Sequence, residues 1–167
     1  MPRYRPLPEN AEVVDVLCSV ILHYDNVSSI MKILKEPQST VSEKLRFLKK
    51  NRVISKNKWE FEVNWDELLK LLRSLVKKEL IGLSKKHLKL FDGRLKRIME
   101  VYSAMVIELG HKPKSLRDIV WMYLLGVCQT DNKELEKADK GFVKLKKELM
   151  AMSEERYLFM TSEDKDD

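Results

Sequence analysis

The sequence predicts a mainly α-helical protein, with one small β-hairpin in its first half and an all-α region in its second half. Apolar residues recur every three or four positions along most of the chain, which predicts amphipathic helices. Strict alternation of apolar and polar residues is confined to a short segment around Phe61, which predicts a strand of the hairpin. Two later segments repeat apolar residues at alternating intervals of three and four, as coiled coils do.

Charge is distributed unevenly along the chain. The 167 residues carry a formal net charge of +6, which fits an anionic partner. Cations are concentrated in residues 38–58, where Glu43 is the only acid, whereas residues 161–167 form an acidic tail. A basic block ahead of an acidic segment is seen in nucleic-acid binders, and a tail that only adds solubility is the alternative.

Several functional classes are disfavoured by what the sequence lacks. Cys18 and Cys128 lie far apart in apolar runs and form no metal-binding or redox pair, which predicts buried thiols in a reducing compartment. A secretory leader pattern is missing, and the longest apolar run, residues 119–128, is too short to span a bilayer. We therefore expect a cytoplasmic protein without a membrane partner.

Catalytic signatures are missing as well. The chain has only five glycines, no phosphate-binding glycine loop, no G-x-S-x-G and no H-E-x-x-H. Its histidines, His23, His87 and His111, have no spacing that suits a metal ion. The sequence therefore predicts a protein that is not an enzyme and needs no metal or other cofactor.

The first elements are predicted from breaks in the apolar pattern. Residues 1–10 are basic and rich in proline, which predicts an extended arm. An apolar helix is expected over residues 13–24, ending near Asp25, and a shorter one over residues 27–34. Pro37 then breaks the chain, so the two helices are followed by a tight turn.

A third helix is predicted over residues 38–50. Thr40 and Glu43 have the spacing of a capping box, which would mark its start. Val41, Leu45 and Leu48 form one apolar stripe, which we expect to be buried. The polar residues around that stripe are Gln38, Ser39, Thr40, Ser42, Glu43, Arg46, Lys49 and Lys50.

A hairpin is predicted directly after the third helix. Trp59, Phe61 and Val63 alternate with polar residues, and residues 53–55 would form the partner strand. The exposed tip would then carry Lys56, Asn57 and Lys58, where the lysines could follow a phosphate backbone. Two helices, a tight turn, a third helix with a polar face and a hairpin make a helix-turn-helix with a wing.

Residues 13–63 resemble the winged helix-turn-helix transcriptional regulators, in the style of the ArsR and MarR families. The residues that carry the resemblance are Ser39-Thr40-Val41-Ser42, Leu45, Leu48, Lys49-Lys50 and Val53-Ile54. Asn51-Arg52 replaces the usual acidic-glycine pair, and Asn51 tolerates the left-handed conformation that glycine would supply. The cysteine pair of the metal-sensing relatives is missing.

The resemblance implies that double-stranded DNA is the partner, with the third helix in the major groove. The residues expected to contact DNA are Gln38, Ser39, Thr40, Ser42, Glu43, Arg46, Lys49, Lys50, Lys56, Asn57 and Lys58.

The second half of the chain is predicted to be helical throughout. A helix begins near Asn64 and ends by Gly82, and a nearly all-apolar one follows Ser115, which has capping spacing to Asp118. Two further helices carry heptad seams, over residues 84–109 and in the last third of the chain. The seam residues expected in a dimer interface are Leu88, Phe91, Leu95, Ile98, Tyr102, Met105, Leu109, Leu135, Phe142, Leu145 and Leu149.

Four regions are therefore predicted: an arm (1–10), a DNA-binding domain (11–82), a helical dimerisation domain (83–160) and an acidic tail (161–167). An internal three-helix bundle is the alternative to the homodimer. The function predicted is a dimeric, sequence-specific DNA-binding regulator. An architectural DNA-binding protein and a winged-helix module that binds protein both remain open, as does a small-molecule or protein effector.

Overall fold

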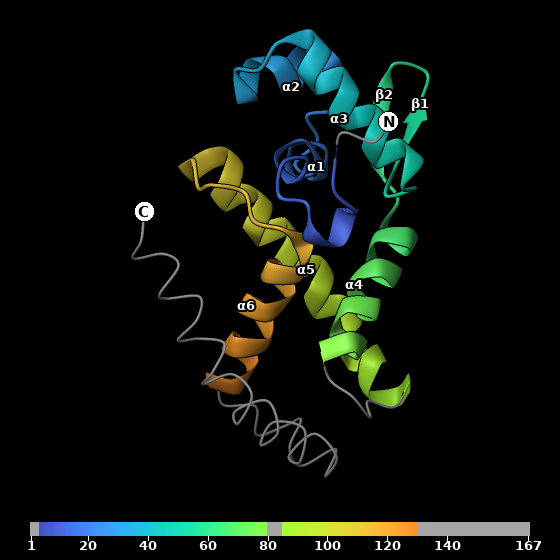
Figure 1. The fold of residues 1–167 in the computed structure, drawn as a ribbon, viewed down its shortest axis with the longest axis vertical. Coiled ribbons are helices and arrows are strands. Elements are labelled where there is room, and N and C mark those ends of the chain that lie inside the picture. Colours follow the sequence, from blue (N-terminus) through green and yellow to red (C-terminus); the bar gives the residue numbers. More distant parts are fainter. Residues whose placement is uncertain (1–3, 80–84, 130–167) are drawn as a thin grey trace. The chain divides into compact units, whose positions relative to one another are not determined.

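The computed structural model describes residues 4–79 and 85–129, with side chains described over residues 4–76 and 93–123. Figure 1 shows, in chain order, the 3-10 helix η1 (Leu7–Glu9), helices α1 (Val14–Ile21), α2 (Val27–Leu34) and α3 (Gln38–Lys50), strands β1 (Ile54–Asn57) and β2 (Glu60–Val63), and helices α4 (Trp65–Glu79), α5 (Lys85–Leu109) and α6 (Leu116–Gln129). The predicted fold class is confirmed, because the helices of a helix-turn-helix are followed by a two-stranded wing and then by further helices.

The chain divides into two compact units, Met1–Ile119 and Val120–Asp167. All elements from η1 to α5 belong to the first unit. The described part of the second unit is residues 120–129, within α6. The predicted domain limits at residues 82 and 160 stay predictions.

Helix α1 is the centre of the first unit because it is apolar on nearly every side. All of its residues except Asp15 are buried, and it packs against α2, α3, β2 and α5. Figure 1 shows this helix end-on in the middle of these elements. Cys18 behaves as the buried thiol that the sequence predicts, and burial raises the pKa of this thiol to about 12.

The turns on either side of α2 depend on two non-glycine residues with a left-handed backbone. His23 (φ 70°) follows α1, which therefore ends at Ile21, earlier than predicted. Lys35 (φ 54°) terminates α2 in the same way. The start of α2 is capped by Asn26, whose side-chain oxygen accepts a hydrogen bond from the Ser29 N–H at 2.8 Å.

Helix α3 begins earlier than its predicted capping box. Its first residue is Gln38, directly after Pro37, and no side chain caps this end. Thr40 and Glu43 both lie inside the helix, so the predicted capping box is wrong. The reason is Pro37: it is extended (ψ 157°) with φ held at −70°, so the helix can start at the next residue without a capping side chain.

The far end of α3 also differs from the prediction by one residue. The left-handed residue is Arg52 (φ 66°) and not Asn51. Asn51 instead completes the last helical turn, since both its backbone N–H and its side-chain amide donate to the Phe47 carbonyl, at 3.0 Å and 2.9 Å. The reversal into β1 therefore falls on the following residue.

Helix α5 packs on α1 and α4 through a face that is rotated from the predicted heptad seam. Its buried side chains are Leu95, Met99, Tyr102, Ser103 and Val106. Leu95 and Tyr102 belong to the predicted seam, but Leu109 at its end is 70% exposed. Residues that repeat every seven positions drift gradually around a straight helix, so more than one apolar stripe of α5 could be buried. The positions of α1 and α4 select which stripe is buried.

The rest of the predicted seams falls beyond what can be described. The side chains of Leu88 and Phe91 lie outside the described part, and so do Leu135, Phe142, Leu145 and Leu149. The role of the seams in a dimer stays a prediction.

The start of α6 is as predicted. The Ser115 hydroxyl accepts a hydrogen bond from the Asp118 N–H at 3.2 Å, which caps the helix. The preceding loop is held by Tyr102, whose hydroxyl accepts from the Lys114 N–H at 2.6 Å. Trp121 in this mostly apolar helix is buried.

The N-terminal arm is more ordered than predicted. Instead of being extended throughout, it forms η1, in which Leu7 is buried. Before η1, the Tyr4 ring meets the Phe47 ring of α3 edge-on, with 5.2 Å between the centroids. Glu9 then forms an ion pair of 2.8 Å with Arg117. The arm is thereby tied to α3 and to the first turn of α6.

Candidate nucleic-acid interface

The inner side of α3 is the predicted apolar stripe. Val41, Leu45 and Leu48 are all buried, and the helix contacts α1, α2 and β1. Burying a leucine or valine side chain stabilises the fold by about 1.5–3 kcal/mol, so this stripe is enough to set which side of α3 faces inward.

A lysine is buried beside this stripe. The Lys44 ammonium lies 3.2 Å from the carboxylate of Asp15 in α1 and 3.0 Å from that of Glu36 in the turn before α3. This lysine triad, Asp15–Lys44–Glu36, joins α1, the turn between α2 and α3, and α3. In the sequence, Lys44 counts as part of the basic block. Its spacing of three from Val41 and four from Leu48 is the signal that places it on the inner side.

The lysine triad holds two carboxylates around one cation. Burial raises the pKa of Asp15 to about 6, helped by a hydrogen bond with Glu36 and opposed by the charge of Lys44. For Lys44, burial alone would lower the pKa, but the charge of Asp15 and the hydrogen bond to Glu36 outweigh it and raise the pKa. Lys44 therefore stays protonated and forms its ion pairs within the fold. Its charge is not presented to a partner such as DNA.

The outer side of α3 carries most of the predicted DNA-contacting residues. Exposed on it are Gln38, Ser39, Arg46, Lys49 and Lys50, with Ser42 and Glu43 half-buried among them. At 3.6 residues per turn, Ser39, Glu43, Arg46 and Lys50 lie opposite Val41, and Gln38, Ser42 and Lys49 lie on the flank. Small polar groups therefore lie near the N-terminal end of the exposed side and cations near its C-terminal end.

Thr40 differs from the other predicted residues of α3. It is half-buried and lies seven residues before Phe47, on the same flank of the helix. Phe47 is the residue that meets Tyr4 of the arm. Thr40 is therefore beside the arm contact and not in the middle of the exposed side.

The wing has two unlike faces. In the antiparallel register, Lys56 pairs with Phe61, and Asn57 pairs with Glu60. Paired residues share a face, so Lys56 lies with the buried Phe61, its ammonium 5.7 Å from the ring centroid. The other face carries Asn57, Glu60 and Glu62, all exposed. The outward face of the wing is therefore acidic. The two lysines of the wing lie elsewhere: Lys56 shares the face of Phe61, and Lys58 is in the turn.

The tip of the wing also differs from the prediction. Lys58 and Trp59 form the turn, and Lys58 has a left-handed backbone (φ 57°). The predicted alternation placed Trp59 with Phe61 on the apolar side, but its side chain is 84% exposed. The prediction is wrong because strand alternation ends where the turn begins, so Trp59 has no strand face to share.

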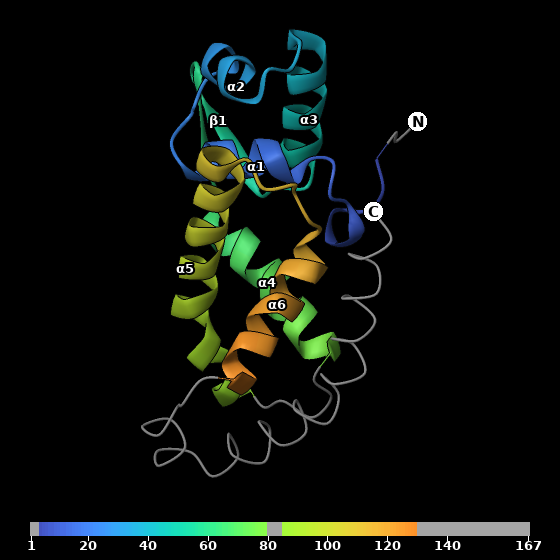
Figure 2. The ribbon, with the colours of Figure 1, turned by 90° about the vertical axis from the view of Figure 1, so that its left-hand side faces the viewer.

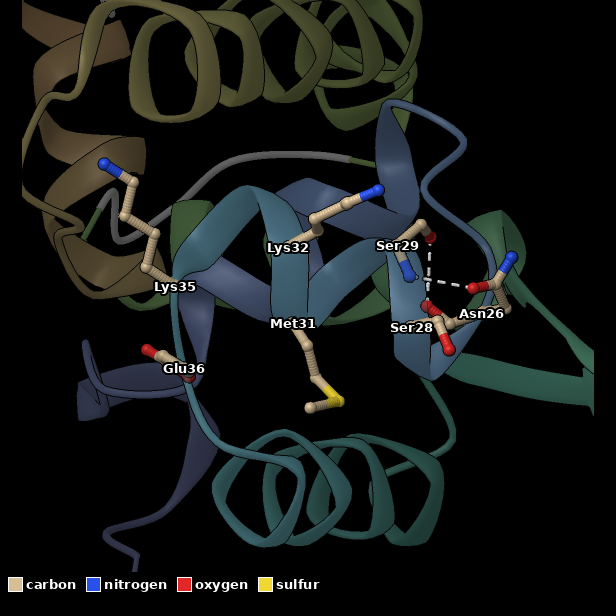
Figure 3. Close-up of a pocket in the computed structure, with 7 residues that line it drawn as sticks. All are labelled: Asn26, Ser28, Ser29, Met31, Lys32, Lys35 and Glu36. Carbon is tan, nitrogen blue, oxygen red and sulfur yellow. Dashed lines mark hydrogen bonds between the residues drawn. The ribbon is translucent and has the colours of Figure 1, made fainter.

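Two cations of α2 were missed by the sequence interpretation. Lys32 and Lys35 line a shallow hollow of about 650 Å³ together with Asn26, Ser28, Ser29, Met31 and Glu36. Figure 3 shows both lysines pointing away from Met31. The signal that could have found them is their position in the helix before the turn, because that helix crosses the DNA backbone in helix-turn-helix proteins.

Figures 1 and 2 both show α2, α3 and the β1–β2 wing gathered at one end of the first unit, while α4 leads away from it. The wing is held there by two backbone hydrogen bonds, from Phe61 N–H to the Asp25 carbonyl at 2.7 Å and from Asn64 N–H to the Val53 carbonyl at 2.9 Å. A polar helix side and a hairpin tip are thus presented together. This is the arrangement of a winged helix-turn-helix DNA-binding domain.

The comparison with known families agrees with this class. Residues 12–56 match the family model "Bacterial regulatory protein, arsR family", so this segment is an ArsR-family helix-turn-helix DNA-binding domain. The match covers α1, α2, α3 and most of β1. No curated protein and no solved structure matches the chain. Regulators of this family are typically non-enzymatic DNA-binding proteins.

Neither a metal site nor a membrane-spanning helix is found among the described residues. Over the described ranges, no group of three or more histidine, cysteine, aspartate or glutamate side chains is arranged to hold a metal ion. The described helices also include none that combines the length and the apolar character needed to cross a membrane.

Proposed function

We propose that this protein is a transcriptional regulator that binds specific sites on double-stranded DNA as a homodimer. The observation that carries the proposal is the two-sided α3 in the ArsR-family segment. Its inner side is held by the apolar stripe and the lysine triad, and its outer side presents polar and cationic groups. A helix whose orientation is fixed in this way can present the same side chains to each DNA site.

The outer side of α3 divides into reading and positioning residues. Ser39, Ser42 and Arg46 lie where base edges would be met in the major groove, and arginine is suited to guanine because it donates two hydrogen bonds to its O6 and N7 atoms. Lys49 and Lys50 are nearer the C-terminal end and would meet phosphates, which set the position of the protein but carry no sequence information.

Homodimerisation is the second part of the proposal. Ile98, Val101, Met105 and Leu109 form a stripe on α5 beside its buried face, and Val101 and Leu109 are exposed. A two-fold pair would place two α3 helices on half-sites about 34 Å apart, one DNA turn. Light scattering at micromolar concentration tests this architecture: a dimer mass is expected, and a strict monomer contradicts it.

Selection of bound sites from random DNA separates this proposal from its alternatives. An enriched inverted repeat supports the dimeric regulator. Binding without an enriched motif, but with affinity that falls steeply with salt, supports an architectural DNA-binding protein. Absence of DNA binding supports a winged-helix module that binds protein. A regulator should prefer its site over non-specific DNA by about a thousandfold or more.

If the protein is such a regulator, it acts in the cytoplasm and is associated with the nucleoid when bound.

A further inference from the structure

The tip of the wing exposes an unusual side chain. Trp59 is the most exposed of the large apolar residues that the structure describes, at 84%. Tryptophan is highly buried on average, because leaving its large apolar surface in water is unfavourable. An indole at the end of a hairpin therefore contributes little to the folded chain itself, and its position calls for a partner outside the chain.

The turn that presents this indole is built at a conformational cost. Lys58 precedes Trp59 in the turn and has φ 57°, a conformation that glycine adopts without strain and lysine does not. Backbone strain of this kind is concentrated at functional sites. Two residues after Trp59, Phe61 is buried and its N–H donates to the Asp25 carbonyl, so the hairpin is anchored close behind the turn while the Trp59 side chain projects.

Charge on the hairpin favours DNA over an apolar protein surface as the partner. Lys58, next to Trp59 in the turn, and Lys56, whose ammonium lies over the Phe61 ring, are both exposed and complement phosphates. The outward face, in contrast, carries Glu60 and Glu62, which would repel phosphates if the hairpin lay flat on the duplex. The distribution of charge therefore favours an approach by the tip, which brings Trp59 to the DNA first.

We propose that Trp59 enters the minor groove beside the α3 site and packs against a base step, with Lys56 and Lys58 on the flanking phosphates. This inference rests on the proposed DNA-binding function. Apolar side chains that enter the minor groove partly unstack base steps and bend the duplex. Pyrimidine–purine steps unstack most easily, so the wing adds a preference for such steps outside the sequence read by α3.

The test compares three full-length variants on a fluorescently labelled duplex of mixed sequence, by anisotropy over a range of salt concentrations. Trp59→Ala should weaken binding about tenfold, the effect expected when one aromatic contact with a base is lost. Trp59→Phe should retain most of the affinity, because a ring remains. Met122→Ala removes another exposed apolar side chain (39% exposed) and should bind like the wild type. Salt dependence should be unchanged in all three, since no phosphate contact is lost.

Fluorescence gives a second measurement that a purely structural role would not change. Trp59→Phe removes only the Trp59 emission, so the difference between wild-type and variant spectra isolates this residue. That difference should be quenched when the duplex is added, because the indole packs against bases. The same titration on the wild type alone cannot show this, since Trp65 and Trp121 also emit.

The outcomes distinguish this inference from the function on which it rests. If Trp59→Ala binds as tightly as the wild type and the difference spectrum is unchanged by DNA, the inference is wrong while DNA binding stands. If the wild type itself does not bind duplex DNA, both are wrong. If Trp59→Ala lowers the molecular mass in solution without weakening DNA binding, the tip contacts another protein chain and the inference is overturned.

Discussion

Helix α3 and the β1–β2 wing lie next to each other and both expose lysines, yet they are held in the fold in opposite ways. Helix α3 is fixed along its whole inner side, by buried apolar residues and by the lysine triad of Asp15, Lys44 and Glu36. The wing is fixed on one face only, through the buried Phe61 and two backbone hydrogen bonds, and its turn, Lys58 and Trp59, is exposed.

This contrast shows that residue type alone does not tell which groups face a partner. Lys44 belongs to the basic block but is used inside the fold, where it forms ion pairs with two carboxylates. Trp59 is the largest type of apolar side chain but is exposed at the tip. Substitutions in α3 should therefore affect either stability or DNA binding, depending on the side of the helix, whereas substitutions at the wing tip should chiefly affect binding.

The largest effect is expected for Lys44→Ala. Removing the ammonium leaves the carboxylates of Asp15 and Glu36 close together and poorly solvated, which should lower the free energy of unfolding by about 3–5 kcal/mol. Urea denaturation measures this change. The matched control is Lys49→Ala on the exposed side of the same helix, expected to change stability by less than about 0.5 kcal/mol. Equal effects for the two variants would mean that the lysine triad does not hold α3.

The free energy of unfolding should also depend on pH through Asp15 of the same lysine triad. The pKa of Asp15 is raised from 3.8 to about 6 in the folded protein, so the folded state binds more protons between these values. The associated stabilisation is fully present below pH ~4 and is lost as the pH rises through about 6.

The Asp15→Asn variant has no carboxyl group at this position, so its free energy of unfolding is the reference for the wild type. Stability of the wild type relative to Asp15→Asn should fall by about 2–3 kcal/mol across that pH window, as a two-unit shift implies. Urea denaturation of both proteins at each pH isolates the contribution of Asp15 from those of other carboxyl groups. A stability difference that stays constant with pH would show that Asp15 titrates normally.

Arg46→Ala probes the outer side of α3. It should weaken binding to a selected site by about 1–3 kcal/mol and relax sequence preference there, if Arg46 reaches a base edge. Lys56→Ala or Lys58→Ala on the wing should instead weaken all duplexes similarly and lower the salt slope by about one unit. Anisotropy with specific and mixed duplexes measures both effects. If Arg46→Ala binds like the wild type, the reading side of α3 has been misplaced.

The smallest effect is expected at the turn of the wing. Lys58→Gly should stabilise the fold by up to about 1 kcal/mol, because glycine adopts the left-handed backbone without strain. Lys35→Gly at the end of α2, where φ is 54°, is the matched substitution in the helix-turn-helix and should act in the same direction. Thermal denaturation measures both. A loss of stability in Lys58→Gly would show that the lysine side chain holds the tip.

Much of the helix-turn-helix was predictable because apolar residues recur at helical spacing along its short helices. Val41, Leu45 and Leu48 are predicted to be buried and are buried. Predictions were less accurate where local signals competed. The capping box of Thr40 and Glu43 was overridden by Pro37, and the left-handed residue after α3 is Arg52 because Asn51 bonds back to Phe47.

Helix periodicity, the turn at Pro37 and the hairpin were determined by the sequence alone, since each depends on residues that are close together in the chain. The tertiary structure decided which lysine is internal, which stripe of α5 is buried and that Trp59 is exposed. The first two depend on groups distant in sequence: Asp15 lies twenty-nine residues from Lys44, and the buried face of α5 is selected by α1 and α4. The exposure of Trp59 follows from the position of the turn, which the alternating pattern did not mark. Local patterns specify what a segment can bury, and only its neighbours in space decide what it does bury.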